Sequence, residues 1–188
     1  MTSDTLQVRR LLETDDRSEF RSGDLELDRF FALYAGQNQF RHHLGTSYVA
    51  VDAKQTIVGY ATVTVSEVSP TLVAGVASRK VRLPHHGANQ RTLGSGIKYP
   101  LPVLRLARLA VDERARNLGV GAQLMRSVFT LAVQLANDVG CVGVVVDAKA
   151  QAVAYYQRLG FVKLDVVAGE LGVRPVPCMM FLEIGQLL

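Results

Sequence analysis

The sequence VLRLARLAVDERARNLGVGAQLM occupies residues 103–125 and joins three kinds of segment in a short length of chain. The apolar run Val103–Val111 predicts a strand, and a charged turn follows it. A loop with two glycines comes next, and the apolar spacing then predicts an amphipathic helix over Gly121–Asn137. A strand, a glycine loop and a helix in this order are typical of an α/β fold.

The loop in this stretch has the properties of an anion-binding site. Backbone N–H groups at the start of a helix have no carbonyl partner within the helix, and glycines allow a ligand to approach them closely. Arg114 and Arg116 flank the loop and carry charge that can pair with phosphate. The segment therefore predicts a place to hold a pyrophosphate.

Bulk composition indicates an ordinary globular protein of 188 residues, with 48% hydrophobic and 20% charged residues, which fits a single domain over 1–188. No apolar run approaches the roughly 20 residues that a membrane span requires, and the N-terminus has no apolar signal core. The spacing of Cys141 and Cys178 suggests neither a disulfide framework nor a metal site. We expect free thiols, no metal, no membrane contact and a cytoplasmic location.

The net charge of +4 and the pI of 9.3 are mild, but the positive charge is concentrated in one segment. This segment, expected to be a basic insertion at about residues 79–100, has no acidic residue between its first and last cations. It is either a solvated loop or a surface for a polyanion such as RNA. An enzyme that binds only a phosphorylated cofactor would not need this cluster. Its candidate ligands for the polyanion are Arg79, Lys80, Arg82, Arg91 and Lys98.

The remaining elements alternate between strand and helix, without internal repeats or a clear linker. Alternating or short apolar runs predict strands at Leu6–Leu12, Ser47–Val51, Ile57–Val65, Val142–Val146, Phe161–Val167 and Cys178–Ile184. Helical spacing predicts helices at Asp24–His43, capped by Ser22 or Asp24, and at Gln151–Leu159, ended by Gly160. The order of elements predicts one α/β sheet.

Two motifs resemble the GNAT N-acetyltransferases. The pattern Arg116-x-x-Gly119-x-Gly121 after the strand LARLAV is similar to the family's acetyl-CoA loop. The block Tyr155–Phe161, YYQRLGF, resembles the family's Tyr-x-x-x-Gly-Phe element. The resemblance implies the GNAT fold, which is an α/β fold with a mixed central sheet flanked by helices, and acetyl-CoA as the acetyl donor.

The resemblance also implies roles for individual residues. Tyr156 matches the position whose hydroxyl protonates the leaving thiolate in the family, whereas Tyr155 beside it is expected to pack. The expected acetyl-CoA residues are Leu109, Ala110 and Val111 beside the pantetheine, and Arg114, Arg116, Leu118, Gly119, Val120, Gly121 and Ala122 around the pyrophosphate.

The general base is left open by the sequence. Family members transfer acetyl directly to a neutral amine through a tetrahedral intermediate, so a base, an oxyanion site and an acid are needed. Asp112 and Glu113 follow the strand closely, but charged turn residues of this kind are expected to be solvated. The histidines are suitable by type and match no motif; they are His42, His43, His85 and His86.

The N-terminal region resembles a subgroup of the family, the GNAT toxins of type II toxin–antitoxin systems. The similarity lies in Phe20–Phe31, FRSGDLELDRFF, and in Ala35–Gln39, AGQNQ. It implies acetylation of the α-amino group of an aminoacyl-tRNA, which blocks translation, and a ribbon-helix-helix antitoxin as partner. It also allows a homodimer, because toxins of the subgroup are often dimers. The basic segment, beside Arg9, Arg10 and Arg41, is then the expected tRNA surface.

Two alternatives remain open at this stage. The acceptor could be a small-molecule or protein amine, in which case the basic segment is incidental. The chain could also be a non-catalytic module that binds acyl-CoA. The segment before the strand LARLAV is longer than usual for the toxin subgroup, so the resemblance identifies the donor more firmly than the acceptor.

Overall fold

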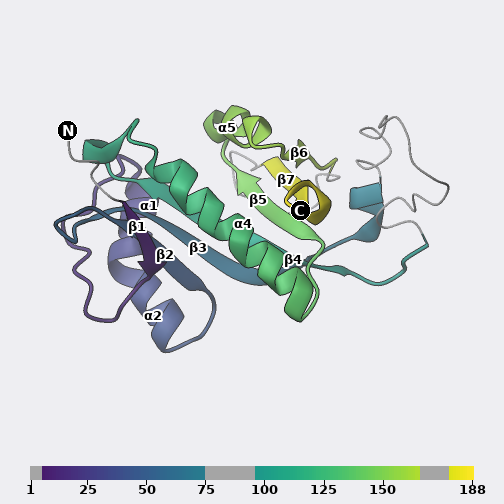
Figure 1. Ribbon diagram of the computed structural model, residues 1–188, viewed down its shortest axis with the longest axis horizontal. Coiled ribbons are helices and arrows are strands. Elements are labelled where there is room, and N and C mark those ends of the chain that lie inside the picture. The colour runs from purple at the N-terminus through teal and green to yellow at the C-terminus, as the bar shows by residue number, and fades with distance from the viewer. Residues whose placement is uncertain (1–5, 75–95, 166–177) are drawn as a thin grey trace. The chain divides into compact units, whose positions relative to one another are not determined.

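The computed structural model describes residues 6–74, 96–165 and 178–188. The chain forms two compact units, one from Met1–Thr64 with Leu106–Leu131 and the other from Val65–Arg105 with Ala132–Leu188. Hydrogen bonds join the strands in the order β1-β2-β3-β4-β5-β7-β6, and helices flank them (Figure 1). The α/β prediction is confirmed.

The strands are β1 (Gln7–Arg10), β2 (Thr46–Val51), β3 (Ile57–Val68), β4 (Leu101–Val111), β5 (Gly143–Ala148), β6 (Val162–Lys163) and β7 (Cys178–Glu183). The helices are α1 (Leu25–Arg29), α2 (Ala35–Phe40), α4 (Val120–Asp138) and α5 (Val153–Arg158), with a π-helical turn at Phe30–Tyr34. Each predicted strand corresponds to one of these strands, the two C-terminal predicted helices correspond to α4 and α5, and the predicted helix over residues 24–43 corresponds to α1, the π turn and α2 together. Most of the expected basic insertion, residues 79–95, lies outside the described residues, as do residues 166 and 167 of the predicted sixth strand.

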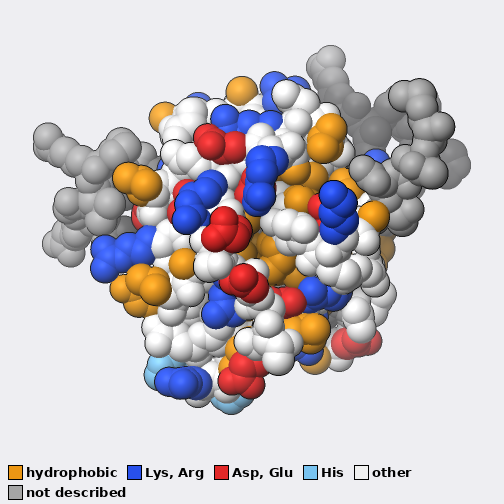
Figure 2. All heavy atoms as spheres, turned by 90° about the vertical axis from the view of Figure 1, so that its left-hand side faces the viewer, with side chains coloured by type: hydrophobic (Ala, Val, Ile, Leu, Met, Phe, Trp, Pro, Cys, Tyr) orange, Lys and Arg blue, Asp and Glu red, His pale blue; other side chains and the backbone are white. Residues whose placement is uncertain are grey.

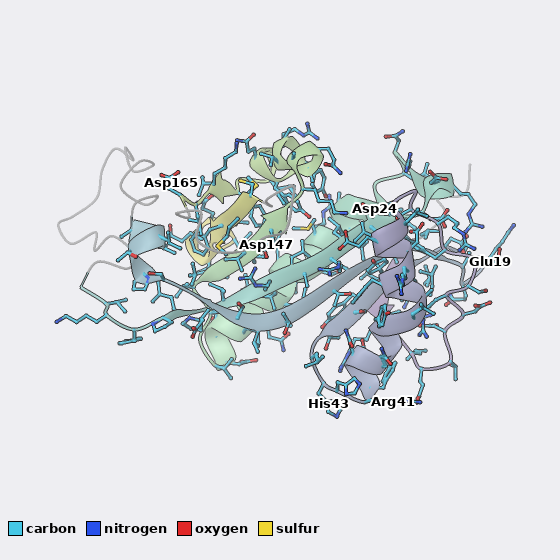
Figure 3. All side chains as sticks on the ribbon, turned by 180° about the vertical axis from the view of Figure 1, so that it is seen from behind. Glu19, Asp24, Arg41, His43, Asp147 and Asp165 are labelled. Carbon is cyan, nitrogen blue, oxygen red and sulfur yellow. The ribbon has the colours of Figure 1, made fainter. Side chains whose placement is uncertain are left out.

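The first unit is built on an antiparallel meander of β1, β2 and β3. Gln7 lies opposite Val51 in the first pair, and Thr46 lies opposite Val63 in the second. The turn of the predicted hairpin contains Gln55 in a left-handed conformation, at a φ of 63°. Helix α4 covers one face of these strands and the α1–α2 segment covers the other (Figures 1 and 3).

An aromatic cluster forms the centre of this unit's core. The Phe31 ring stacks on the Tyr60 ring at a centroid distance of 4.2 Å and an interplanar angle of 5°. Phe20 meets both rings edge-on, at 5.0 Å and 5.4 Å, and the Tyr60 hydroxyl donates a hydrogen bond of 2.8 Å to the Leu27 carbonyl. Because Phe20 and Phe31 belong to the N-terminal region, that region is anchored in the core rather than laid over the surface. The buried members of the cluster are Leu11, Phe20, Phe31, Ala35, Val49, Val51, Ile57, Tyr60 and Ala110.

The predicted helix over residues 24–43 is shorter than expected and is interrupted by the π turn. Its cap is Asp24, which accepts hydrogen bonds from the backbone N–H groups of Glu26 and Leu27. In the π turn the N–H of Ala35 reaches back to the Phe30 carbonyl. The extra residue in this turn lets both Phe30 and Phe31 stack on Tyr60. Helix α2 ends at Phe40, three positions before the predicted end.

The second unit is held by β7, which pairs antiparallel with β5 on one side and with β6 on the other. Gly143 lies opposite Glu183 in the first pair, and Val162 lies opposite Phe181 in the second. Both cysteines are free thiols, Cys141 buried and Cys178 partly buried. The core of this unit consists of Val68, Val73, Leu101, Val103, Val145, Leu164 and Phe181.

Candidate active site

The loop between β4 and α4, residues 112–119, contains the predicted anion site. A 3₁₀ turn at Glu113–Ala115 redirects the chain after β4. Asn117 and Gly119 then adopt left-handed conformations, with φ of 65° and 78°. No heavy atom lies within 4 Å of the position that a Cβ on Gly119 would occupy, so the glycine is required by its conformation.

Helix α4 begins directly after this loop and presents unpaired donors. Gln123 donates to the Gly119 carbonyl at 3.1 Å, the first backbone bond of the helix. The N–H groups of Val120, Gly121 and Ala122 precede that bond and have no carbonyl within the helix to accept them. Together with the positive end of a 19-residue helix, they make a place that can accept an anion.

The start of α4 is fixed by a glycine that sequence reasoning did not single out. Gly59 lies in β3 directly beneath the helix. A Cβ at this position would lie 2.6 Å from Cγ1 of Val120, 3.1 Å from Cδ1 of Leu124 and 3.2 Å from the Ala110 carbonyl oxygen. Only glycine therefore allows the first turn of α4 to approach β3 and β4 this closely. In the sequence, Gly59 stands inside a strand pattern, a place where glycine often marks a close approach.

Asp112 is buried, and its side chain is 0% exposed, which corrects the expectation of a solvated turn residue. The Arg114 guanidinium donates to both carboxylate oxygens, from Nε at 2.8 Å and from Nη2 at 2.9 Å. The backbone N–H groups of Arg21 and Arg114 donate to the same carboxylate at 3.1 Å and 3.0 Å. Four hydrogen bonds from Arg21 and Arg114 thus converge on the Asp112 carboxylate and hold the loop in place.

Hydrogen bonding decides the charge state of Asp112. Burial by itself raises the pKa of a carboxyl group, because it disfavours the charged form. The hydrogen bonds from the Arg114 side chain and from the backbone of Arg21 and Arg114 outweigh burial and lower the pKa of Asp112 to about 2. The carboxylate is therefore ionised at neutral pH and is unsuited to act as the missing base.

The loop is tied to the N-terminal turn, residues 19–24, by hydrogen bonds from both sides. The N–H of Glu113 donates to the Arg21 carbonyl at 2.8 Å, and the Arg21 N–H donates to Asp112. Nη2 of Arg116 donates to the Ser22 carbonyl at 2.6 Å, and Nη2 of Arg114 reaches the Glu19 carbonyl at 3.4 Å. The N-terminal region and the β4–α4 loop are consequently one connected structure.

These contacts give Arg114 and Arg116, both predicted to bind phosphate, a structural role. Arg114 is paired with Asp112, and Arg116 with Ser22 and with Glu113 at 3.3 Å. Their side chains are still 60% and 56% exposed, so each guanidinium keeps solvent-facing N–H groups. Of the predicted pantetheine residues at the end of β4, Ala110 is buried and Leu109 and Val111 are partly buried.

Tyr156 belongs to the second unit. It is 5% exposed and packs edge-on against the rings of Tyr155 at 5.3 Å and Phe161 at 5.4 Å. Its carbonyl accepts from the N–H of Phe161 at 3.1 Å, and Gly160 between them has a φ of 94°. Burial raises the pKa of the Tyr156 hydroxyl, which therefore stays protonated at neutral pH. The Tyr155 hydroxyl is buried and has no hydrogen-bond partner among the described residues.

Of the remaining predicted residues, only His42, His43, Glu113 and Lys98 lie within the described residues. His42 and His43 are exposed just beyond α2, near Arg41, and far along the helical segment from Asp24 (Figure 3). Glu113 is exposed and paired with Arg116. His85, His86, Arg79, Lys80, Arg82 and Arg91 lie outside the described residues, and Lys98 is exposed.

The described surface shows no single-sign basic face from the side drawn in Figure 2, where cationic and anionic side chains intermix. Within residues 6–74, 96–165 and 178–188, no group of three or more metal-ligating side chains is gathered. Over the same residues, no helix has the length and apolar character needed to cross a membrane.

Known proteins resemble this chain in sequence and in fold. A tRNA-acetylating toxin of Mycobacterium tuberculosis (strain ATCC 25618 / H37Rv) is 28% identical over 155 residues, which are 81% of this chain and 82% of that protein. The structure of AtaT complexed with acetyl-methionyl-tRNAfMet matches with a TM-score of 0.75 and 21% identity over 97% of each chain. An AtaT mutant bound to the C-terminus of the antitoxin AtaR and to acetyl-CoA matches with a TM-score of 0.70 and 20% identity, over 98% of this chain and 96% of that one.

The family itself is shown by the sequence. The model of the acetyltransferase (GNAT) family matches residues 6–161, which include β1, the β4–α4 loop, α4 and the Tyr156 block. The chain therefore belongs to the acetyltransferase (GNAT) family.

Proposed function

We propose that the protein transfers the acetyl group of acetyl-CoA to the α-amino group of an aminoacyl-tRNA and thereby blocks translation as a toxin. The observation that carries the proposal is the attachment of the N-terminal turn to the β4–α4 loop through Asp112, Arg114 and Arg116. The N-terminal region is the part of the sequence that resembles the toxins. Its hydrogen bonds to the loop tie this region to the proposed donor site.

The donor site is proposed to use backbone atoms more than side chains. The N–H groups of Gly119, Val120, Gly121 and Ala122 would hold the pyrophosphate. The Leu118 N–H, predicted with them, already donates to the Ala115 carbonyl at 3.3 Å. Main-chain groups of Leu109, Ala110 and Val111 would lie beside the pantetheine. Arg114 and Arg116 keep solvent-facing N–H groups that can add charge to the same site.

Acetyl-CoA, when bound, supplies an activated thioester that an amine can attack directly. Tyr156 is proposed as the acid that gives its hydroxyl proton to the thiolate as the C–S bond breaks. Support comes from its position four residues before Gly160 and from its burial, which keeps the hydroxyl protonated. The α-amino group of an aminoacyl ester has a lower pKa than a lysine side chain, so it needs less help from a base. This agrees with the exposed, unmatched positions of His42 and His43.

The expected basic segment is proposed as part of the tRNA surface. Of its candidate tRNA-binding residues, Lys98 lies within the described residues and is exposed. Contacts of this kind go to phosphates and make binding strongly salt-dependent. A ribbon-helix-helix antitoxin is the proposed protein partner, a homodimer the proposed assembly and the cytoplasm the proposed location. We further propose that both units belong to one acetyltransferase domain, because the family match includes parts of each.

The test is acetyl transfer from labelled acetyl-CoA by the purified protein, with three acceptors in parallel. These are a charged total-tRNA pool, the same pool after deacylation, and a panel of small amines and peptides. The proposal expects label on the charged pool alone. Equal labelling of the deacylated pool, or preferential labelling of the small amines, would contradict the tRNA assignment. Binding of acetyl-CoA without any transfer would instead support a non-catalytic module.

A further inference from the structure

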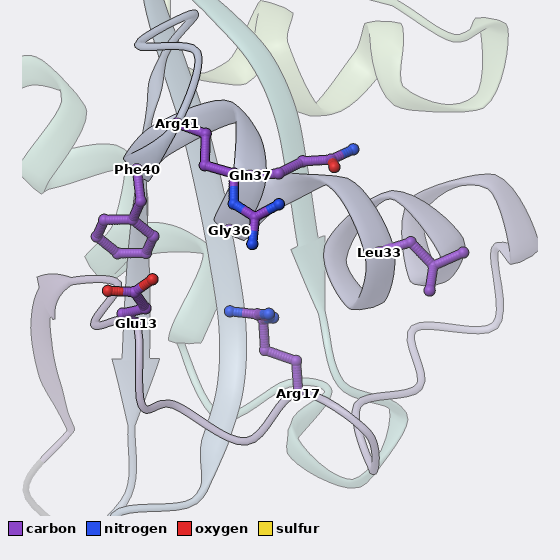
Figure 4. A pocket seen from close by; sticks show the side chains of 7 residues that line it. All are labelled: Glu13, Arg17, Leu33, Gly36, Gln37, Phe40 and Arg41. Carbon is purple, nitrogen blue, oxygen red and sulfur yellow. The ribbon is translucent and has the colours of Figure 1, made fainter.

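A pocket of about 250 Å³ lies in the first unit, between the loop that follows β1 and helix α2. Its polar lining includes two arginines from different segments, Arg17 in the loop and Arg41 at the end of α2. Figure 4 shows their guanidinium groups pointing toward each other, with the Glu13 carboxylate beside the ring of Phe40. None of these residues has a role in the donor site.

Arg17 is held in this pocket with unsatisfied donors. Its Nε and Nη1 atoms are buried and have no hydrogen-bond partner among the described residues. Its guanidinium lies flat against Gly36, where a Cβ would come within 3.1 Å of both Nη1 and Nη2. Buried N–H groups of a charged side chain are costly to leave unpaired, and two facing guanidinium groups repel each other. Both facts call for an anion between them.

The walls of the pocket are fixed before any ligand arrives. Asp15 accepts from both Nη atoms of Arg9 at 2.8 Å and from the Leu12 N–H at 2.8 Å, which pins the loop. Gln39 on α2 is buried; its amide donates to the Leu11 carbonyl at 2.9 Å and accepts from the Ser47 N–H at 2.7 Å. The loop that carries Arg17 and the helix that precedes Arg41 are therefore both tied to the sheet.

From this geometry we propose that the Arg17–Arg41 pocket binds a phosphate group. A tetrahedral phosphate presents oxygens in several directions and can accept from two guanidinium groups on opposite sides, whereas a carboxylate offers two oxygens in one plane. Leu33 and Phe40 add an apolar wall next to the charges. The favoured source is a backbone phosphate of the RNA acceptor, a part of the inference that rests on the proposed function. The other source is a small phosphorylated molecule.

The first arm of the test uses inorganic phosphate and does not depend on any acetyl transfer. Nitrogen-15 spectra of arginine side chains are recorded during a phosphate titration, and the Arg17 Nε–H signal is assigned by its loss in Arg17→Gln. The proposal expects this signal to shift in a saturable way, and to stop responding in Arg41→Gln. Glu13→Gln removes the one carboxylate of the lining and should tighten phosphate binding about threefold.

The second arm measures binding of deacylated tRNA as a function of salt. Arg17→Gln and Arg41→Gln should each weaken binding about tenfold and lower the slope of log K against log salt by about 1, as expected for one lost phosphate contact. Arg126→Gln, which removes an exposed arginine on α4 outside the pocket, is the matched control and should change neither quantity. Unchanged melting temperatures verify that the variants fold.

The phosphate titration and the tRNA-binding experiment together distinguish an RNA phosphate from a small phosphorylated molecule. A phosphate-induced shift with unchanged tRNA binding would overturn the RNA source and assign the pocket to a small phosphorylated molecule. The absence of any shift at Arg17, with tRNA binding equal to wild type in both variants, would overturn the phosphate site altogether. Because neither arm requires acetylation, a failure of the proposed function would appear separately, in the transfer assay.

Discussion

Replacement of Asp112 by Asn tests whether one buried carboxylate organises the β4–α4 loop. A fall in the pKa from an ordinary 3.8 to about 2 corresponds to about 2 kcal/mol of folding stability at neutral pH. Asn keeps the size of the side chain but loses the charge that holds Arg114, and its amide N–H₂ faces donors. We therefore expect Asp112→Asn to lower the free energy of unfolding by about 3 kcal/mol at about pH 7.

The stability difference between wild type and Asp112→Asn should also depend on pH in a definite direction. A carboxyl whose pKa is lowered by folding stabilises the protein above its unfolded pKa, and this contribution is lost as the pH falls through the folded value. The difference between wild type and Asp112→Asn should thus narrow by about 1 kcal/mol between about pH 6 and about pH 3. The assay is urea unfolding followed by circular dichroism across this range.

Glu113→Gln is the matched control for this experiment. Glu113 is the adjacent carboxylate, it is 53% exposed, and its ion pair with Arg116 lies at the surface. Its replacement should change stability by less than about 0.5 kcal/mol. Asp112 does not organise the loop if the unfolding free energy of Asp112→Asn lies within about 1 kcal/mol of wild type, or if its loss of stability is the same at both ends of the pH range.

Three further predictions follow from single contacts. Tyr156→Phe should lower kcat about 10²-fold and leave the Kd for acetyl-CoA unchanged in calorimetry, and an unchanged kcat would remove Tyr156 as the acid. Gly59→Ala places a Cβ 2.6 Å from Cγ1 of Val120, so the free energy of unfolding should fall by about 2 kcal/mol and acetyl-CoA should bind more weakly. Unchanged stability and unchanged acetyl-CoA binding would mean that α4 can move away from β3 freely. Gln39→Leu leaves the Leu11 carbonyl and the Ser47 N–H unpaired, so the free energy of unfolding should fall by about 2 kcal/mol. A variant as stable as wild type would contradict this prediction.

The elements that sequence reasoning predicted well are those with a strong local pattern. Helix α4 and strand β4 follow from apolar periodicity, and the cap at Asp24 follows from residue type and position. The β4–α4 loop is recognisable because glycine spacing and a helix start coincide. Here the physical requirement is local, so the residues that meet it are neighbours in the chain.

The features that were missed depend on partners distant in sequence. Asp112 is buried because Arg21, 91 positions earlier, donates to it, and a charged turn gives no sign of this. Its only local signal is an arginine two positions later. Gly59 resembles any other strand glycine until α4 is packed on it, and the π turn accompanies the stacking of two phenylalanines on Tyr60, a residue distant in sequence. Arg17 lies in a polar loop and becomes notable only through its unpaired buried atoms.

Acetylation of the α-amino group of an aminoacyl-tRNA can be read from the chemical structure of the product. A charged tRNA pool is incubated with the protein and acetyl-CoA, digested to nucleosides, and analysed by mass spectrometry for the aminoacylated 3′-terminal adenosine. We expect one acetyl group on the α-amino nitrogen of the amino acid attached to that adenosine. Acetyl groups found only on nucleobases, only on amino-acid side chains, or not at all would contradict it.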